Sequence, residues 1–119
     1  MDTKLVSLGE VTATEIITDE ILIKTAQDAL DIMASSPSRH IIVHEYNFGK
    51  DFFDLSTRIA GEILQKFTNY QVRLAIVGDY SKFKSKSLQD FIYESNKNGE
   101  YLFVNTVEQA ITIWKKNMQ

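Results

Sequence analysis

The residues of this chain best suited to acid–base chemistry end a short apolar run, HIIVHE, which spans residues 40–45. His44 and Glu45 are adjacent, and an imidazole beside a carboxylate can transfer a proton. Successive side chains of a β-strand point to opposite faces, however, so these two would not meet. His40 and His44 would share a face roughly 13 Å apart, too far to bind one metal ion. We therefore predict that His44 is a structural, hydrogen-bonded histidine rather than a catalytic one.

Polar side chains also follow the two strands predicted in the second half of the sequence. In open α/β sheets, ligands bind outside the carboxyl ends of the strands, where loops and helix N-termini converge. For Asp79, which directly follows Gly78, the alternative is a role in a turn or a helix cap. A pocket at this edge of the sheet would bring together the candidate ligand-binding residues His44, Glu45, Asn47, Asp79, Ser81 and Asn105.

No motif of a known catalytic or cofactor site is present in the sequence. It lacks the glycine-rich dinucleotide and P-loop signatures, the HExxH zinc-protease motif and the GxSxG nucleophile motif. The absence of cysteine excludes disulfides, thiol catalysis and Cys-ligated metals. For a serine nucleophile at Ser56 or Ser81, only His44 could serve as the base. The sequence therefore predicts no catalytic residue, no metal site and no cofactor, and it disfavours an enzyme without excluding one.

Aromatic and basic residues supply two candidate contact surfaces. Tyr46 and Phe48 lie in the loop after the apolar run, and we expect this loop, residues 46–50, to be exposed and suited to a protein partner. The segment SKFKSKS, residues 81–87, carries lysines at alternate positions. These lysines form either a solvated loop before a helix or a contact for an anion or an acidic partner. They are Lys82, Lys84 and Lys86.

The bulk composition fits one globular domain over residues 1–119, with 44% apolar residues and a net charge of −3. The acidic balance argues against nucleic-acid binding, because nucleic-acid-binding domains are usually basic. The N-terminal residues MDTKLVSLGE lack the apolar core of a signal peptide, and no stretch approaches the roughly 18 apolar residues of a membrane span. We expect a cytoplasmic protein that does not bind a membrane.

Hydrophobic periodicity predicts an alternation of strands and helices after an opening hairpin. Strands are expected over residues 4–8, 11–18, 39–45, 72–79 and 101–104, and helices over 19–35, 55–67, 86–97 and 107–114. The order ββαβαβαβα predicts an α/β fold: a mixed, largely parallel sheet of about five strands with four helices and right-handed crossovers. Leu74–Val77 is the least polar stretch and is expected to be the central strand.

Turn and capping residues predict where these elements begin and end. Gly9-Glu10 is typical of a hairpin turn, and Asn98-Gly99 is expected to end the third helix with Gly99 at positive φ. The expected N-caps are Thr18 or Asp19, Asp51, and Thr106, the last in a capping box with Gln109.

The segment DFFDLSTRIAGEILQKFTNYQVRLAIVGDYSKFKSKSLQDFIYESNKNGEYLFVNTVEQAI, residues 51–111, resembles bacterial proteins of the domain-of-unknown-function family 4180. The similarity covers about residues 16–111 and is most specific between 51 and 99. This resemblance implies relatives without implying an activity.

A more distant resemblance, in architecture, is to the STAS domains of anti-sigma-factor antagonists and sulfate transporters. The element order is similar, and RLAIVGD (residues 73–79) and YLFVNTVEQAITIW (residues 101–114) look like the second half of that group. STAS domains bind partner proteins, and some are phosphorylated on a serine in a D-S-S-G-like turn. The matching segment, Asp54–Thr57, contains Ser56 but lacks the adjacent second serine and the glycine, which disfavours phosphorylation of Ser56.

Two functions are compatible with the sequence. The favoured one is a non-enzymatic regulatory or interaction module that binds a protein partner or a second copy of itself. The alternative is a small-molecule binding protein, or an enzyme of unrecognised type, that uses the strand-end pocket. A flat, apolar exposed patch would favour the first function, whereas a deep pocket containing His44 or Asp79 would favour the second.

Overall fold

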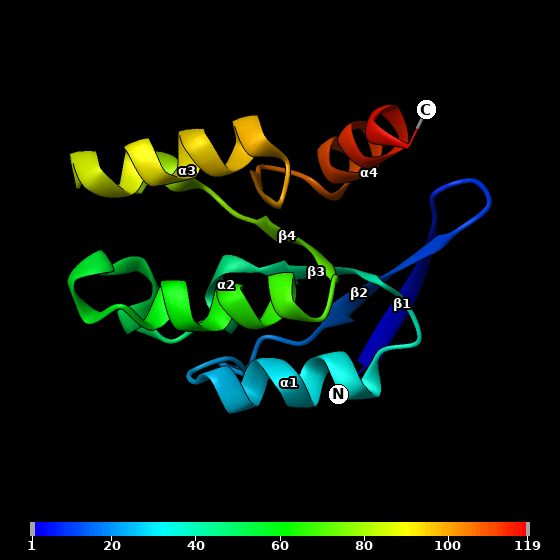
Figure 1. Cartoon of the computed structure of the whole chain (residues 1–119), viewed down its shortest axis with the longest axis horizontal. Helices are drawn as coiled ribbons and strands as arrows, with labels where there is room; N and C mark the ends of the chain where they lie inside the picture. Colours follow the sequence, from blue (N-terminus) through cyan, green and yellow to red (C-terminus); the bar gives the residue numbers. More distant parts are fainter. Residues whose placement is uncertain (1, 119) are drawn as a thin grey trace.

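Strands and helices alternate after an opening hairpin in the computed structural model, which describes residues 2–118 (Figure 1). The strands are β1 (Asp2–Ser7), β2 (Thr12–Ile17), β3 (His40–His44), β4 (Arg73–Val77) and β5 (Tyr101–Val104). The α-helices are α1 (Ala26–Ser35), α2 (Ile59–Asn69), α3 (Lys86–Asn98) and α4 (Val107–Asn117). Short 3₁₀ turns occupy Glu45–Asn47, Lys50–Phe53, Leu55–Thr57 and Tyr80–Lys82. The predicted order of elements is confirmed.

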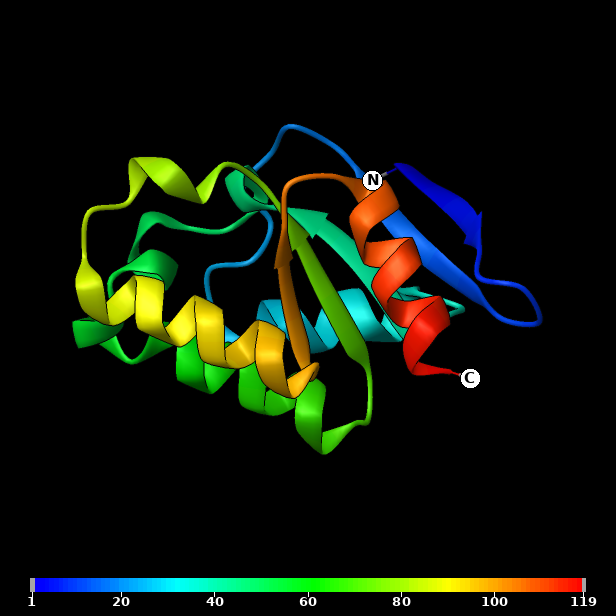
Figure 2. The ribbon, with the colours of Figure 1, turned by 90° about the horizontal axis from the view of Figure 1, so that it is seen from above.

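Each strand of the sheet lies next to the strand that follows it in the sequence, so the chain crosses the sheet in one direction. Its strands lie in the order β1-β2-β3-β4-β5, with an antiparallel β1–β2 hairpin and parallel pairing from β2 to β5. Right-handed crossovers that always step to the next strand place their helices on the same face. Accordingly, α1, α2 and α3 cover one face, and α4, which follows the last strand, covers the other (Figures 1 and 2). The predicted fold class, a mixed and largely parallel α/β sheet, is confirmed.

Two apolar layers, one on each face, enclose the middle of the sheet. The larger layer joins α1, α2 and α3 to strand residues such as Ile41 and Ile76, which are fully buried. The smaller layer lies under α4 and joins Trp114 to Ile42. Since neighbouring residues of β3 enter different layers, the run Ile41–Val43 is buried from both sides, as predicted.

The β1–β2 hairpin turns at Gly9, as the sequence predicts. Gly9 has a φ of +94°, a conformation that glycine adopts without steric cost. The Leu8 amide donates to the Val11 carbonyl at 2.8 Å, which closes the two-residue turn. This hydrogen bond also sets which backbone groups of β1 point toward β2.

The helix expected after Thr18 or Asp19 begins instead after Thr25, so the predicted cap is wrong. The Thr25 hydroxyl accepts from the Asp28 amide, and the Asp28 carboxylate accepts from the Thr25 amide, which forms a capping box. Residues 21–23 continue the helical spacing of apolar side chains, but their backbone pairs with the chain beyond β3. This long-range pairing competes successfully with local helix formation.

The predicted cap at Asp51 is also wrong, because α2 begins at Ile59 and not near Leu55. The chain between β3 and α2 makes three short 3₁₀ turns. Arg58, immediately before α2, has a left-handed backbone with a φ of +65°. A left-handed residue interrupts the right-handed helical path, so the turn at Leu55 cannot be continuous with α2.

The ends of α3 and α4 follow the sequence signals closely. Gly99 ends α3 with a φ of +77°, and its amide donates to the Ser95 carbonyl, which confirms the predicted left-handed terminus. At the start of α4, the Thr106 hydroxyl accepts from the Gln109 amide at 3.1 Å. The Gln109 side chain accepts from the amide of Asn105 rather than that of Thr106, so the reciprocal half of the box is shifted by one residue.

The complete burial of Ile76 in β4 predicts a large effect of truncating its side chain. The expectation that Leu74–Val77 is the central strand is wrong, because β3 lies in the middle of the order β1-β2-β3-β4-β5. β4 is nevertheless paired on both sides, by β3 and β5, and Leu74 and Ile76 are fully buried while Val77 is 9% exposed. Ile76→Ala should lower the free energy of unfolding by about 2–5 kcal/mol in a urea titration, because it leaves a cavity. Tyr93→Ala, on the exposed side of α3, is the control and should change it by less than about 0.5 kcal/mol. An equally small change for Ile76→Ala would contradict the placement of Ile76 in the core.

Candidate functional site

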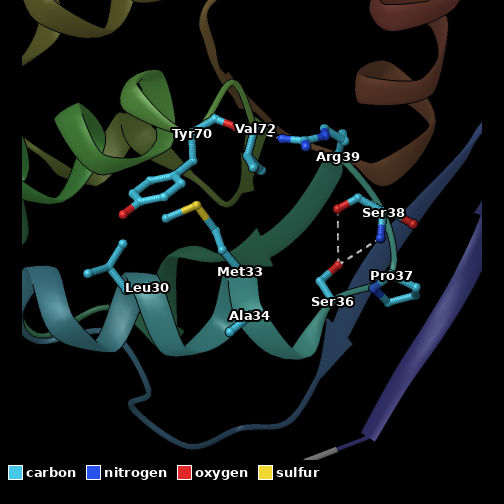
Figure 3. Close-up of a pocket in the computed structure, with 9 residues that line it drawn as sticks. All are labelled: Leu30, Met33, Ala34, Ser36, Pro37, Ser38, Arg39, Tyr70 and Val72. Carbon is cyan, nitrogen blue, oxygen red and sulfur yellow. Dashed lines mark hydrogen bonds between the residues drawn. The ribbon is translucent and has the colours of Figure 1, made fainter.

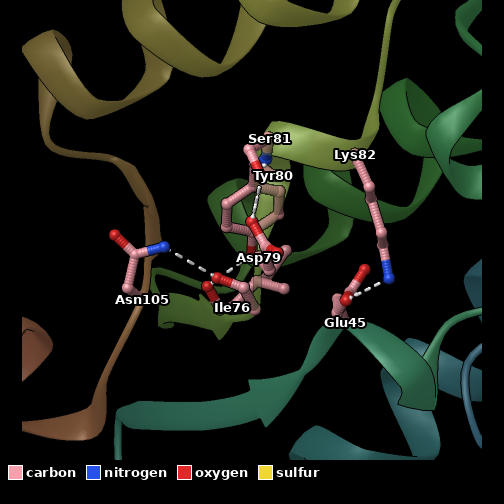
Figure 4. Close-up of polar contacts among 8 residues, drawn as sticks. Glu45, Ile76, Asp79, Tyr80, Ser81, Lys82 and Asn105 are labelled. Atoms are coloured by element: carbon pink, nitrogen blue, oxygen red, sulfur yellow. Dashed lines mark hydrogen bonds and ion pairs between the residues drawn. The ribbon is translucent and has the colours of Figure 1, made fainter.

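The residues predicted at the carboxyl ends of the strands lie at one edge of the sheet, but other groups of the same chain already bind their side chains (Figure 4). Glu45 forms an ion pair with Lys82, in the turn after β4. The side-chain amide of Asn105, beyond β5, donates to the Gly78 carbonyl at 3.0 Å. The ends of β3, β4 and β5 are therefore joined by their own polar side chains.

Gly78 provides the space that the Glu45–Lys82 ion pair needs. A Cβ at position 78 would lie 2.4 Å from Cγ of Glu45, closer than two carbon atoms approach without a bond. The absent side chain lets the Glu45 carboxylate extend past the end of β4 toward Lys82 (Figure 4). The strand-terminal glycine thus serves an internal contact.

Asp79 and Ser81 form a closed local unit. Oδ1 of Asp79 accepts from both the Ser81 amide, at 3.0 Å, and the Ser81 hydroxyl, at 2.6 Å. These hydrogen bonds lower the pKa of the exposed Asp79 carboxyl below its usual range. Asp79 is therefore a charged cap of its own turn, and the Ser81 hydroxyl donates to this cap rather than to a base.

Tyr80, between Asp79 and Ser81, was not predicted as a site residue, and its side chain turns inward. Its hydroxyl donates to the Ile76 carbonyl at 2.6 Å, and its ring lies edge-on to Phe103. Burial, with a smaller effect from the charge of Glu45, raises the pKa of the Tyr80 hydroxyl far above its ordinary value. The hydroxyl therefore stays protonated and acts as a structural donor.

The loop after β3 is partly buried, so the prediction that residues 46–50 form an exposed contact loop is wrong for two of its members. Tyr46 is exposed, but Asn47 is fully buried and Phe48 is 4% exposed. The Phe48 ring packs on Phe52 with ring centroids 4.1 Å apart. Phe48 belongs to the core because the chain turns back over the sheet at this point, and its ring is not available to a partner.

Asn47 uses its buried amide to join three parts of the chain. Its Oδ1 accepts from the His44 amide at 2.9 Å, and its Nδ2 donates to the carbonyls of Thr18 and Glu20 at 3.0 and 2.9 Å. A ligand role, which the sequence suggested for Asn47, would require breaking these contacts. The side chain is occupied by the fold.

His44 pairs with Glu15, a residue that sequence reasoning missed. Nε2 of His44 lies 3.1 Å from Oε2 of Glu15, and the two side chains are 19% and 11% exposed. The ring of Tyr46 stacks on the imidazole with centroids 5.1 Å apart. Glu15 lies within the β-prone run TATEII, and a carboxylate among buried strand residues was the available signal. His44 and Glu45 bind different partners and do not form a dyad.

The lysines of the 81–87 segment do not form one basic patch. Lys82 is paired with Glu45, and Lys86 is paired with Asp90 one turn later in α3. No ion pair joins Lys84 to another residue in the range 2–118. Two of the three charges are thus offset locally, which weakens the attraction for an anion at this segment.

Ser56 lies on the surface in the turn before α2. Its hydroxyl donates to Oδ1 of Asp54 at 2.6 Å, and these contacts lower the pKa of the Asp54 carboxyl. The arrangement repeats that of Asp79 and Ser81 after β4. Phosphorylation of Ser56 stays a prediction from the sequence.

One groove near these residues lies between β1 and α4. It has a volume of about 500 Å³ and is lined by Glu15, Glu108 and Lys4 and by the apolar side chains of Val6, Val107 and Ile111. One oxygen of the Glu15 carboxylate is bound by His44, and no hydrogen bond within residues 2–118 reaches the other. The groove opens on the face that α4 only partly covers.

A second groove, of about 460 Å³, lies at the opposite end of the sheet, between α1 and the end of α2 (Figure 3). Its walls include Leu30, Met33 and Tyr70, and the Arg39 guanidinium donates to the Tyr70 carbonyl at 2.7 Å. Within the described part of the chain, no three His, Asp or Glu side chains are placed to hold a metal ion. None of the helices in residues 2–118 has the length and apolarity to cross a membrane.

Comparison with known proteins places the chain in a family. The model of the family described as "Domain of unknown function (DUF4180)" matches residues 8–113. The protein belongs to this family. The match confirms the resemblance to family 4180 seen in the sequence. Searches of curated proteins and of solved structures find no match. Because the description of DUF4180 names no activity, the function has to be argued from the geometry.

The contact between Gly78 and Glu45 predicts that even a methyl group is costly at this position. Gly78→Ala should lower the free energy of unfolding by about 1–3 kcal/mol in a denaturant titration, because Glu45 must leave its place beside Lys82. Gly61→Ala is the control, since a Cβ at this position in α2 meets no atom within 4 Å and alanine favours a helix. Equal stabilities of the two variants would show that Glu45 moves aside freely.

Proposed function

We propose that this protein is a non-enzymatic interaction module that binds a protein partner beside the carboxyl ends of β2 and β3. The binding surface consists of Ile17, Ile21 and Tyr46, and we call it the strand-end surface. These side chains are 43%, 56% and 51% exposed. Large apolar and aromatic side chains left exposed in neighbouring segments are typical of protein contact sites. This exposure is the observation that carries the proposal.

The strand-end surface is held in place before any partner binds. Ile21 lies in the segment whose carbonyls accept from the Asn47 side chain, and Tyr46 directly precedes Asn47. The Tyr46 ring is supported by the imidazole of His44, which is in turn held by Glu15. A surface that is already ordered loses little conformational entropy on binding, which favours recognition.

The polar residues at the same edge support binding over catalysis. Glu45 is paired with Lys82, Asp79 is bound by Ser81, and the Tyr80 hydroxyl is buried on a carbonyl. A catalytic group needs a free position from which to reach the reacting atom. These groups have no such freedom in the present arrangement.

A regulatory role in the cytoplasm is part of the same proposal. The chain has no cysteine and needs no oxidising compartment for its stability. The similarity of element order to STAS domains, and the exposed Ser56 hydroxyl in a turn before a helix, favour a partner-binding module that could be modified. A phosphate on Ser56 would add negative charge near the start of α2.

Replacing Tyr46 tests the proposed surface. In capture experiments from the source organism, quantified by mass spectrometry, Tyr46→Ala should reduce recovery of the specific partner by about tenfold or more, since losing an aromatic anchor often costs 2 kcal/mol. Tyr93→Ala removes a tyrosine on α3 that is 66% exposed, more than Tyr46, and is the matched control. His44→Gln should instead lower the melting temperature. A partner retained equally by the Tyr46 and Tyr93 variants would contradict the assignment.

The groove between β1 and α4 favours a second function, the binding of a small molecule. Its buried carboxylate and apolar walls suit a ligand with a donor group, such as a primary ammonium, on an aliphatic body. Small aliphatic amines should then raise the melting temperature of the wild type, and Glu15→Gln, which keeps the shape, should abolish this increase. The same increase in both proteins would place the amine elsewhere.

A further inference from the structure

The two edges of the sheet are protected differently. At the β5 edge, the Asn96 side chain accepts from the Phe103 amide at 2.7 Å and donates to the Phe103 carbonyl at 3.1 Å, so it pairs with the strand as another strand would. At the β1 edge, no hydrogen bond joins the outer backbone to any other residue in 2–118, and no helix lies outside it (Figures 1 and 2). An uncovered edge strand is a template for pairing with another chain.

The hairpin geometry shows which backbone groups of β1 are unpaired. The Leu8 amide donates inward to Val11, and inward and outward residues alternate along an antiparallel pair. The register of β1 with β2 is continuous from Asp2 to Ser7. The amides and carbonyls of Thr3, Leu5 and Ser7 therefore point away from the sheet.

The outward backbone groups of β1 can form hydrogen bonds with those of β1 from a second copy of the chain, and one pairing register satisfies them best. A two-fold axis perpendicular to the sheet makes two β1 strands antiparallel and keeps each face continuous. Centring the axis on Leu5 pairs Leu5 with Leu5 and Thr3 with Ser7, so all three outward residues exchange hydrogen bonds. Centring it on Lys4 leaves Ser7 unmatched and sets two lysines directly opposite, which is unfavourable.

We infer that β1 pairs antiparallel with β1 of a second copy, with Leu5 on the two-fold axis. Leu5 is 60% exposed in the single chain, and pairing covers it with the same side chain of the partner. Lys4, a residue type that often blocks edges, pairs with Glu15 in the β1–β2 register and lines the same groove as Glu108, so its charge is locally offset.

The contact is limited to one short strand from each copy. Such an interface falls below the roughly 1,200 Å² of specific stable complexes, so the dimer should be weak and dependent on concentration. It does not use Ile21 or Tyr46. Failure of this pairing would therefore leave the proposed strand-end surface untouched, and the reverse also holds.

The absence of native cysteine allows the register to be read by cross-linking. In the inferred dimer Lys4 faces Val6 of the other copy as a non-hydrogen-bonded pair, with Cα atoms about 4.5 Å apart, within disulfide range. A mixture of Lys4→Cys and Val6→Cys proteins under mild oxidation should form mainly the mixed disulfide, as measured by mass spectrometry. Disulfides that form equally well from Lys4→Cys alone would overturn the register.

The oligomeric state of the full chain tests the pairing itself. Light scattering after gel filtration should show a dimer fraction that rises with concentration in the wild type. Leu5→Pro should remove it, because the Leu5 amide points outward and the internal pairing of β1 does not need it. Leu5→Lys, which puts like charges on the axis, should do the same without proline. The control Val11→Lys, on the hairpin turn, should keep the dimer.

A monomer at every concentration up to about 1 mM would overturn the inference. A dimer that survives both Leu5 variants would overturn it equally, since the contact would then lie elsewhere. Thermal unfolding of each variant distinguishes a loss of the dimer from a loss of the fold.

Discussion

The buried side chain of Asn47 is the contact on which the strand-end edge depends. This side chain is fully buried. It accepts a hydrogen bond from the His44 amide in β3 and donates two to the carbonyls of Thr18 and Glu20, which follow β2 in the sequence. A buried polar group that loses its partner costs about 1–3 kcal/mol, so aspartate, without the donors, and leucine, without any polar atom, are poor replacements. Through its backbone carbonyl, Asn47 also binds the amides of Leu22 and Ile23.

This contact accounts for features that look unrelated in the sequence. It ties residues 18–23 to the chain beyond β3 in a non-helical path, which delays the start of α1 until after Thr25. It sends Phe48 into the core and leaves Tyr46, two residues earlier, on the surface. The same tie places Ile21 near the end of β3. A structural amide thus determines which apolar side chains remain outside, and recognition at this edge depends on it.

The elements that sequence reasoning predicted well are those determined locally. β5, α3 and the end of α3 at Gly99 depend on neighbouring residues, periodicity and one glycine. The errors fall where distant contacts compete with local preference, at the start of α1 and between β3 and α2. Glu15 was missed for the same reason, because its partner His44 lies 29 residues away. The edge residues were found from topology, but their mutual pairing depends on side-chain geometry that no spacing reveals.

The two faces and two edges of the sheet differ because the chain winds in one direction. Three helices cover one face, and α4 alone covers part of the other, so the groove beside β1 remains open. At the outer edge of the last strand, β5, the Asn96 side chain of α3 forms hydrogen bonds with the backbone. No helix of residues 2–118 lies beyond the outer edge of the first strand, β1 (Figures 1 and 2). Lys4 and Val6 of β1 line this groove, while the outer backbone of the same strand is free to pair. A ligand in the groove and a second copy at the edge would contact the same strand, and any change that one makes in the affinity for the other is matched by an equal change in the reverse direction.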